Sequence, residues 1–432
     1  MLKTHRYWLG LFWLVTILVL PLPLIQTMTD NLATIYSSES LAINLGIIAY
    51  VWMLFELLIA TRPAWIERVI GLPEMYFVHG IIGIAAIVLA YVHKIMSSSN
   101  GWVAWFGNIA LDILIAVAIY SIFFLGGWLT DRVRWAKLLK DRLEKVFRHE
   151  VSVWLHRLNV VATGFVFIHV ILINYISSIL PFMILFYLYT LIAFGSYFWT
   201  KYRNVFRGIH GRVVLNETLS STTQKISIEL RRSHKLKYQS GDYIFISLPK
   251  RSGMHEPHPF SILNVANQSG LIELMIRKDG DWTSKVPTLK IGETVKIIGL
   301  AGTLRNMVEN ESAGKPLVLL AGGSGIPPMM SLATEYLHQG RQIYLLWTVH
   351  HESDLVFRDE LAQLKLECPE SFTYQTQVGR FTVRELERLL VNVDNNKYYL
   401  LSGPNVMMIS NRRELRQLGV AKENIYFEKF SF

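Results

Sequence analysis

The sequence predicts three successive domains: a six-helix, all-α transmembrane bundle, an antiparallel β-barrel and a doubly wound α/β domain. Three observations predict this multi-domain order. Apolar residues make up 51% of the 432-residue chain and are concentrated as long runs in its first 200 residues. Short alternating runs follow Gly208, and after Gly314 strand-like runs alternate with helix-like stretches. The expected domains are therefore 1–207, 208–314 and 315–432.

Six segments of the first domain are long enough to cross a membrane, which takes about 20 apolar residues. They are 8–25, 41–60, 75–96, 107–128, 151–173 and 179–199. The first begins close to Lys3 and Arg6 and so resembles a signal sequence. It lacks a small-residue cleavage site and contains Pro21 and Pro23, so we expect a membrane helix.

The net charge of +10 suggests nucleic-acid binding, but the position of the basic residues argues against it. They all fall on one side of the membrane, in every second linking stretch, and the opposite loops contain almost no basic residues. They are Lys3 and Arg6, Arg62 and Arg68, the basic loop 129–150, and Lys201, Arg203 and Arg207. This pattern and the even number of segments predict cytoplasmic termini. We expect a multi-pass plasma-membrane protein with no nucleic-acid partner and no obligatory protein partner.

The only cysteine is Cys368. One cysteine excludes disulfides within the chain, Cys-ligated zinc and iron–sulfur clusters. Any redox chemistry must therefore use bound cofactors.

Two sets of strands are expected in the rest of the chain. Runs bounded by Gly, Asp and Asn predict the barrel strands 211–216, 224–230, 243–248, 260–265, 271–277 and 294–299. Runs followed by helix-like stretches predict the parallel strands 316–321, 342–348, 372–376 and 398–402 of a Rossmann-like sheet.

Four histidines fall within the apolar segments: His79 and His93 in the third, His156 and His169 in the fifth. At about 1.5 Å of rise per residue, each pair is spread over roughly 20 Å of helix. Since both helices run outward, His79 is expected level with His156, and His93 with His169. Two facing imidazoles at each of two depths predict two bis-histidine haems, because polar groups in hydrocarbon are usually functional. Histidines bonded between helices, or a proton path, are the alternatives.

The spacing of 13 residues leaves His169 off the face of His156. A bend near Gly164, or haems rotated about the membrane normal, would be needed. Arg157, beside His156, is either a partner for a haem propionate or an ordinary interfacial arginine.

The barrel region contains a candidate flavin site. His258, Pro259, Phe260 and Ser261 lie at the start of an expected strand, where a turn with a buried Phe is the alternative. Arg277 would neutralise a flavin phosphate, and the main chain near Trp282 and Thr283 would bind the flavin edge.

The α/β region contains a candidate dinucleotide site. The loop Gly322, Gly323, Ser324, Gly325 and Pro328 follows an apolar strand and precedes a helix, an arrangement that binds pyrophosphate. Further candidate residues are Ser402, Gly403 and Pro404 for the nicotinamide end, Arg380 for a phosphate, and the terminal Phe432, which would stack on flavin or pack in the core.

Together these motifs resemble the NADPH oxidase and ferric reductase family in a compact bacterial form. The resemblance covers almost the whole chain: a ferric-reductase-type membrane domain and a ferredoxin–NADP reductase-like module. The histidine spacings of 14 and 13 match the family's haem pairs. The segment His258–Ser261 resembles its His-Pro-Phe-Ser/Thr flavin motif. Gly323, Gly325 and Pro328 fit its Gly-x-Gly-x-x-Pro loop.

Two further motifs fit, and one does not. Gly403-Pro404 is similar to the family's Cys-Gly-Pro motif, with Ser402 in place of the cysteine, and Phe432 matches the aromatic expected over the flavin ring, which makes it the candidate catalytic residue. Relatives commonly have Gly-Pro-Tyr-Gly where this chain has 299–302, Gly-Leu-Ala-Gly, so no pyrophosphate contact is carried over to that loop.

The resemblance implies FAD, two b-type haems and NADPH, and a superoxide-forming NADPH oxidase activity. Hydride would pass from cytosolic NADPH to FAD. Single electrons would then pass to the haem on His79 and His156, to the haem on His93 and His169, and finally to extracellular oxygen. Two haems are expected because the membrane core is about 30 Å thick.

Three rival functions remain open at this point. A metalloreductase would deliver the same electrons to ferric or cupric chelates. A six-helix channel with a soluble sensor is disfavoured because no span is arginine-rich and the four histidines would be unexplained. The third rival supplies electrons to a separate reductase on the outer face.

Overall fold

The computed structural model describes residues 6–63, 66, 72–124, 149–206, 208–231, 236–266, 270–390 and 393–427. The chain divides into two compact units. The helical unit comprises Tyr7–Pro63 and Glu74–Arg203, and the other unit is built mainly from the chain after Asn204.

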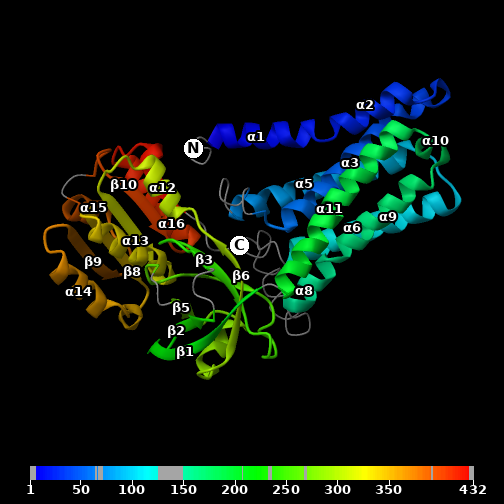
Figure 1. Ribbon diagram of the computed structural model, residues 1–432. Helices are drawn as coiled ribbons and strands as arrows, with labels where there is room; N and C mark the ends of the chain where they lie inside the picture. Colours follow the sequence, from blue (N-terminus) through cyan, green and yellow to red (C-terminus); the bar gives the residue numbers. More distant parts are fainter. Residues whose placement is uncertain are drawn as a thin grey trace. The chain divides into compact units, whose positions relative to one another are not determined.

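The helical unit contains helices that lie side by side in one bundle (Figure 1). They are α1 (Arg6–Val19), α2 (Leu22–Asn31), the 3₁₀ helix η1 (Thr34–Glu39), α3 (Ser40–Ala60), α5 (Leu72–Met96), α6 (Gly101–Phe124), α8 (His149–His156), α9 (Leu158–Ile171), α10 (Asn174–Ser177) and α11 (Leu180–Phe206). Within the described residues, six helical spans are long and apolar enough to cross a membrane: Gly10–Asn31, Thr34–Ala60, Glu74–Met96, Gly101–Phe124, Trp154–Ile171 and Leu180–Arg203. The prediction of six long apolar helices is confirmed.

Two of these spans are interrupted. The first changes from α1 to α2 at Pro21 and Pro23, because proline has no N–H for a helical bond and its ring crowds the preceding turn. The fifth is interrupted at Arg157, between α8 and α9. Most residues of the predicted basic loop 129–150 lie outside the described residues, as do Lys3, Arg68 and Arg207.

Helix α3 is the most enclosed of the six spans. Its Tyr50 stacks on Phe186 of α11 with the ring centroids 5.1 Å apart, and the Tyr50 hydroxyl bonds the Thr190 hydroxyl at 2.9 Å. Phe186 also stacks on Phe167 of α9. The central position of α3 brings its backbone and side chains beside the helices that carry the histidines.

The other unit begins with an antiparallel six-stranded sheet. Its strands are β1 (Ile209–Ser220), β2 (Thr223–Leu230), β3 (Tyr243–Ser247), β4 (His258–Ser261), β5 (Leu271–Arg277) and β6 (Thr294–Ala301), in the order β4-β3-β6-β1-β2-β5. The 3₁₀ helix η3 (Thr283–Thr288) follows β5, and α12 (Leu304–Glu311) follows β6.

The prediction of a closed barrel is wrong, because the sheet is not closed. Its two edge strands, β4 and β5, are joined by an isolated bridge between Ile262 and Leu274 instead of a ladder. β4 has four residues, and its Pro259 has no N–H to donate, so this strand suits an edge. The strand also begins at His258, before the predicted 260–265.

The chain ends in a parallel five-stranded sheet with the order β11-β10-β7-β8-β9. Its strands are β7 (Leu317–Gly322), β8 (Ile343–Val349), β9 (Phe372–Val378), β10 (Tyr398–Ser402) and β11 (Ile425–Phe427). Its helices are α13 (Ile326–His338), α14 (Arg358–Glu367), α15 (Val383–Leu389) and α16 (Asn405–Gln417), with the 3₁₀ helices η4 (Gly323–Gly325), η5 (Glu352–Asp354) and η6 (Lys422–Asn424).

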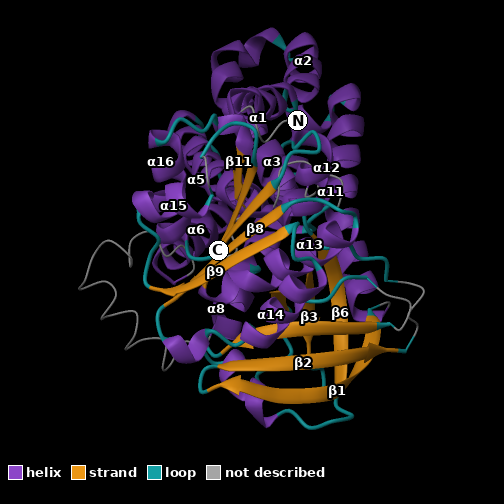
Figure 2. Ribbon diagram, turned by 90° about the vertical axis from the view of Figure 1, so that its left-hand side faces the viewer, coloured by secondary structure: helices purple, strands orange, loops and turns teal. Residues whose placement is uncertain are grey.

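Both faces of this sheet are covered by helices (Figure 2). Helices α12, α13 and α14 pack on one face, around Leu319 and Trp347, and α15 and α16 pack on the other, around Leu320 and Tyr399. All seven residues of β8 are buried, as expected for a central parallel strand. The predicted α/β layout is present, and β11 is an additional strand that was not predicted.

Candidate functional site

Four histidines of the helical unit, His79, His93, His156 and His169, form two facing pairs. The ring centroids of His79 and His156 are 5.8 Å apart, and those of His93 and His169 are 6.3 Å apart. The structure therefore brings together the residues that the sequence paired by depth.

Each histidine has its Nδ1 atom close to an acceptor on a neighbouring helix. The Nδ1 atoms of His93 and His169 lie 2.7 Å and 2.8 Å from the carbonyl oxygens of Ala42 and Val103. A carbonyl oxygen only accepts, so both rings carry the proton on Nδ1 and leave Nε2 free to bind a metal. Helices α3 and α6 contain no histidine, yet they orient these two rings.

Two glycines make this arrangement possible. A Cβ atom added to Gly46 would lie 3.0 Å from Nδ1 of His93, and one added to Gly107 would lie 3.0 Å from Nδ1 of His169. Each glycine is four residues, about one helical turn, after the carbonyl that its histidine binds. A Cβ atom at either position would require the ring to shift by a few tenths of an ångström.

The other pair is held by side chains. Nδ1 of His79 contacts the carboxylate of Glu56 on α3, and Nδ1 of His156 lies 3.0 Å from the Ser121 hydroxyl on α6. Glu56 is 9% exposed, although it lies within an apolar span. The sequence analysis did not identify Glu56, Ser121, Gly46 or Gly107. An acid within an apolar span was the available signal for Glu56, because such residues are rarely tolerated without a partner or a function.

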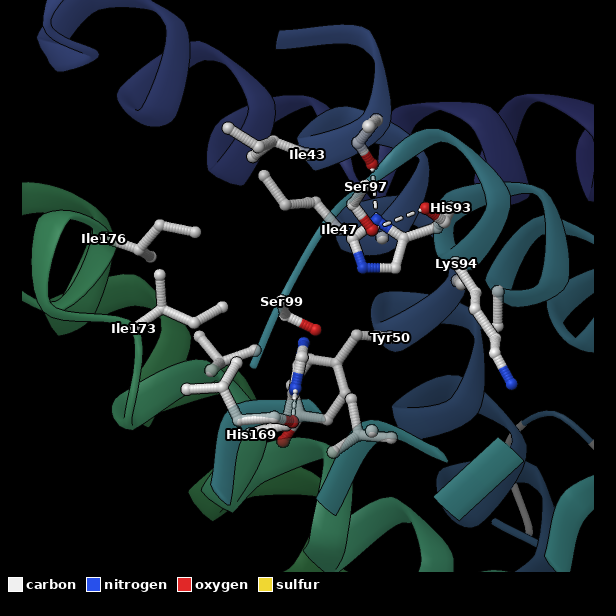
Figure 3. A pocket seen from close by; sticks show the side chains of 18 of the residues that line it. Ile43, Ile47, Tyr50, His93, Lys94, Ser97, Ser99, His169, Ile173 and Ile176 are labelled. Carbon is white, nitrogen blue, oxygen red and sulfur yellow. Dashed lines mark hydrogen bonds between the residues drawn. The ribbon is translucent and has the colours of Figure 1, made fainter. Parts of the chain in front are cut away.

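A cavity of about 460 Å³ adjoins the second pair, and the rings of His93 and His169 point into it (Figure 3). Its size is within the range of small-molecule sites. Apolar residues such as Ile43, Ile47 and Phe182 line most of it, and Lys94, Ser97, Ser98, Ser99, Asn100 and Asn108 add polar groups.

The geometry of both pairs fits haem. A histidine nitrogen binds a metal at about 2.0 Å and lies about 1.1 Å from the ring centre, so two ligands on opposite sides of one metal put their ring centroids roughly 6 Å apart. Both measured separations are close to this value. Among the described residues, no group of three or more His, Cys, Asp or Glu side chains is placed to hold a metal ion. Two histidines suit a metal whose other ligands come from a porphyrin.

The fifth span is interrupted at Arg157, between its two histidines. α8 ends at His156 and α9 begins at Leu158, so His156 and His169 do not share one continuous helix. Gly164, where the sequence analysis considered a bend, lies within α9.

The predicted flavin residues form an aromatic cluster in the antiparallel sheet. Trp282 is buried, and its ring centroid lies 5.1 Å from that of His258 and 5.3 Å from that of Phe260. The Thr283 hydroxyl accepts a bond from the Asp279 N–H at 2.7 Å and closes the turn before Trp282. Pro259 and Ser261 lie on the same edge strand, β4.

The two predicted nucleotide motifs pack against each other at the carboxyl ends of β7 and β10. A Cβ atom on Gly325 would collide with the carbonyl group of Ser402, and one on Gly403 would lie 2.8 Å from the Gly322 oxygen. Glycine is therefore required for this close approach. Pro404 lies 3.3 Å from the Cβ position of Gly322, and α13 begins with Pro327 and Pro328 in its first turn, where proline is favoured.

The two arginines that were predicted to bind phosphates, Arg277 and Arg380, lie at different parts of the fold. A guanidinium nitrogen of Arg277 would be 3.6 Å from a Cβ atom on Gly323, so this arginine is beside the glycine loop, and both residues line a small pocket with Ser324 and Trp347. Arg380 is exposed after the edge strand β9, and β8 separates that strand from β7. The terminal Phe432 lies outside the described residues.

Comparison with known protein families identifies both sheets. A model described as an FAD-binding domain matches residues 213–315, and one described as an oxidoreductase NAD-binding domain matches residues 319–412. The chain contains an FAD-binding and an NAD-binding domain. Together they form a ferredoxin–NADP reductase-like module, and both matches lie after the six apolar spans.

Curated relatives include an electron transfer component, a flavohemoprotein and a reductase. The toluate 1,2-dioxygenase electron transfer component of Pseudomonas putida is 28% identical over 49% of this chain and 65% of its own length. Flavohemoprotein B of Dictyostelium discoideum is 30% identical over 33% of this chain and 36% of its own length. The plasma membrane-associated coenzyme Q6 reductase of Saccharomyces cerevisiae is 26% identical over 44% of this chain and 64% of its own length. The chain spans less than two thirds of each relative. Residues 213–412 therefore contain an FAD-binding and NAD-binding module of the oxidoreductase type.

Proposed function

We propose that this protein is a transmembrane NADPH oxidase, which oxidises cytosolic NADPH and reduces extracellular oxygen to superoxide. The observation that carries the proposal is the pair of facing histidine couples, with ring centroids 5.8 Å and 6.3 Å apart, in the same chain as an FAD-binding and an NAD-binding domain. The proposed orientation has both termini in the cytoplasm of a plasma-membrane protein.

The proposed cofactors are NADPH, FAD and two b-type haems. When bound, FAD would separate the two electrons of a hydride, and the haems would carry them one at a time. His79 with His156, and His93 with His169, would be the haem ligands through their Nε2 atoms.

The residues of the NAD-binding domain would hold the dinucleotide. The backbone N–H groups of Gly323, Ser324 and Gly325 precede α13, so they would bind the pyrophosphate at the positive end of that helix. Ser402, Gly403 and Pro404 would bound the nicotinamide end, and Arg380 would bind a phosphate.

The FAD-binding domain would hold the flavin against β4 and β5. His258, Pro259, Phe260 and Ser261 would provide one wall of the site, with Trp282 and Thr283 behind it. Arg277 would neutralise a phosphate. Phe432 remains the residue expected to cover the flavin ring.

The residues of the helical unit would exclude water and guide the acceptor. The cavity beside His93 and His169 is largely apolar, which suits oxygen as well as a porphyrin, and Lys94 would attract the anionic product.

An absorption spectrum of the detergent-purified protein tests the proposal. We expect a Soret band that shifts when NADPH and FAD are added, with sharp bands of reduced haem. Dye reduction that superoxide dismutase inhibits would identify oxygen as the acceptor, and reduction of ferric chelates that is insensitive to the dismutase would identify a metalloreductase. A protein supplied with haem that shows no Soret band would contradict the haem path.

A further inference from the structure

The four histidines differ in what their Nδ1 atoms contact. His93 and His169 bind neutral backbone carbonyls, and His156 binds a neutral hydroxyl. His79 alone of the four contacts a carboxylate, that of Glu56. The two pairs therefore differ in charge close to the imidazoles.

Glu56 is enclosed where it contacts His79. Its side chain is buried on α3, and the Cβ position of Gly83 lies 3.9 Å from Oε2. Gly83 is four residues after His79 on α5, so α5 packs against the carboxylate one turn beyond the imidazole. An acidic side chain within an apolar span is costly unless it has a partner or a function. The contact with His79 supplies the partner.

We propose that Glu56 is a positioning residue, which makes a haem on His79 and His156 harder to reduce than a haem on His93 and His169. This inference rests on the proposed function. A hydrogen bond to a charged acceptor is roughly twice as strong as one to a neutral acceptor. A carboxylate that accepts the Nδ1 proton increases the basicity of the ligating nitrogen. A more basic axial ligand stabilises ferric over ferrous iron and lowers the midpoint potential.

The consequence is a direction for electron flow. The lower potential at the His79 pair and the higher potential at the His93 pair favour movement of an electron from the first to the second. His93 and His169 donate to neutral carbonyls, so the basicity of their ligating nitrogens increases less.

Redox titration of the full-length, haem-loaded protein tests this inference. Each haem can be measured separately, in a background with His93→Ala and His169→Ala or in one with His79→Ala and His156→Ala. Dithionite, with mediators, supplies one electron to each ferric haem, and the absorption bands report the reduced fraction. The variant is Glu56→Gln, which keeps the size of the side chain and removes its charge. The matched control is Ser121→Ala, which removes the neutral partner of His156.

In the first background we expect Glu56→Gln to favour reduction about tenfold, an upward shift of about 59 mV for one electron. Ser121→Ala should shift the midpoint less. In the second background Glu56→Gln should leave the midpoint unchanged. An unchanged first midpoint, or equal shifts in both backgrounds, would overturn the proposal.

Haem retention gives a second measurement if the variant binds haem poorly. Loss of haem at the His79 pair from Glu56→Gln but not from Ser121→Ala supports the positioning role. Equal loss from both variants contradicts a special role for Glu56. A wild-type protein without a Soret band contradicts the proposed function itself, whereas two haems with unmoved potentials contradict only the role of Glu56.

Discussion

The imidazole of His93 lies directly against Gly46, one helical turn beyond the carbonyl of Ala42 that the ring binds. A Cβ atom on Gly46 would lie 3.0 Å from Nδ1 and 3.1 Å from Cε1 of His93, closer than side-chain atoms normally pack. The position of this ring therefore depends on the lack of a side chain at residue 46.

We predict that Gly46→Ala weakens haem binding at the His93 pair by about tenfold, the lower end of the range for disturbed partners of metal ligands. Alanine is a better helix former than glycine by about 1 kcal/mol, so a weaker helix would not explain the loss. Haem content per protein, from the Soret absorbance during dilution, measures the effect. Gly164→Ala is the control, because a Cβ atom there has nothing within 4 Å. Equal haem retention in both variants would contradict the prediction.

The contact between the glycine loop and the strand end at Ser402 predicts a difference between two alanine variants. A Cβ atom on Gly325 meets the backbone of Ser402 and Gly403, whereas one on Gly322 meets mainly the flexible end of Met407. Overpacking usually costs about 1–3 kcal/mol, and backbone atoms are less able to move than the end of a Met side chain. We expect Gly325→Ala to weaken NADPH binding at least tenfold and Gly322→Ala to weaken it less. The NADPH affinity of both variants can be measured by titration with NADPH, with flavin reduction as the signal. Weaker binding in Gly322→Ala than in Gly325→Ala would contradict this explanation.

Ser402 and Ser331 are both buried serines, but we expect their substitution by alanine to affect thermal stability differently. The Ser402 hydroxyl has no hydrogen-bond partner among the described residues, whereas the Ser331 hydroxyl accepts from the Gly241 N–H at 3.0 Å and donates to the Pro328 carbonyl at 3.1 Å. Losing such a partner costs about 1–3 kcal/mol. We expect Ser331→Ala to lower the thermal unfolding midpoint.

Ser402→Ala should leave that midpoint unchanged or raise it, because it removes an unpaired buried hydroxyl, and should slow NADPH oxidation. Paired thermal unfolding and NADPH oxidation assays separate the two effects. A destabilised Ser402→Ala protein with normal oxidation would count against a role for this hydroxyl at the nicotinamide.

Tyr238 predicts a loss of stability at alkaline pH. Burial raises the pKa of Tyr238 to about 12, the bond from Asn264 opposes this, and the negative charge of Glu273 adds to it. Because the folded pKa is raised above the unfolded value of about 10, the stabilisation is complete below pH 10 and is lost as the pH rises through 12. The difference corresponds to an energy on the order of 2–3 kcal/mol.

The variant Tyr238→Phe should therefore show a smaller decrease of its thermal unfolding midpoint between pH 10 and 12 than the wild type. Tyr399, whose pKa is also raised to about 12 by burial, titrates in both proteins, so the comparison isolates Tyr238. Parallel curves would contradict the prediction. At neutral pH the variant should be slightly less stable, since Asn264 loses a partner.

Periodic patterns predicted most of the fold. The strand 271–277 was predicted at its observed bounds, and the six apolar spans were each located, because both depend on runs of one residue class. The three-residue strand β11 was too short to show a pattern. Closure of the six-stranded sheet depends on the pairing of β4 with β5, and the alternation of apolar residues within each strand does not determine that pairing.

The candidate sites were predicted unevenly for a similar reason. Histidines within apolar segments are conspicuous, so the two pairs could be predicted from spacing alone. Their partners come from helices without histidine, and two of those partners are backbone carbonyls, which have no residue-specific pattern. The interruption at Arg157 was also not predictable, because Arg157 is neither Gly nor Pro.

The distribution of the Nδ1 partners has a consequence for biogenesis. His79 and His93 are held by α3, which is synthesised before them, so their orientation is available as soon as the third span is inserted. His156 and His169 are held by α6, which also precedes them. Each half of the histidine set is thus oriented by the span made just before it, and the facing imidazoles meet only when the fifth span arrives. A nascent chain stopped after α6 would contain two oriented histidines without counterparts, so the proposed haems would be captured only in the last stages of membrane insertion.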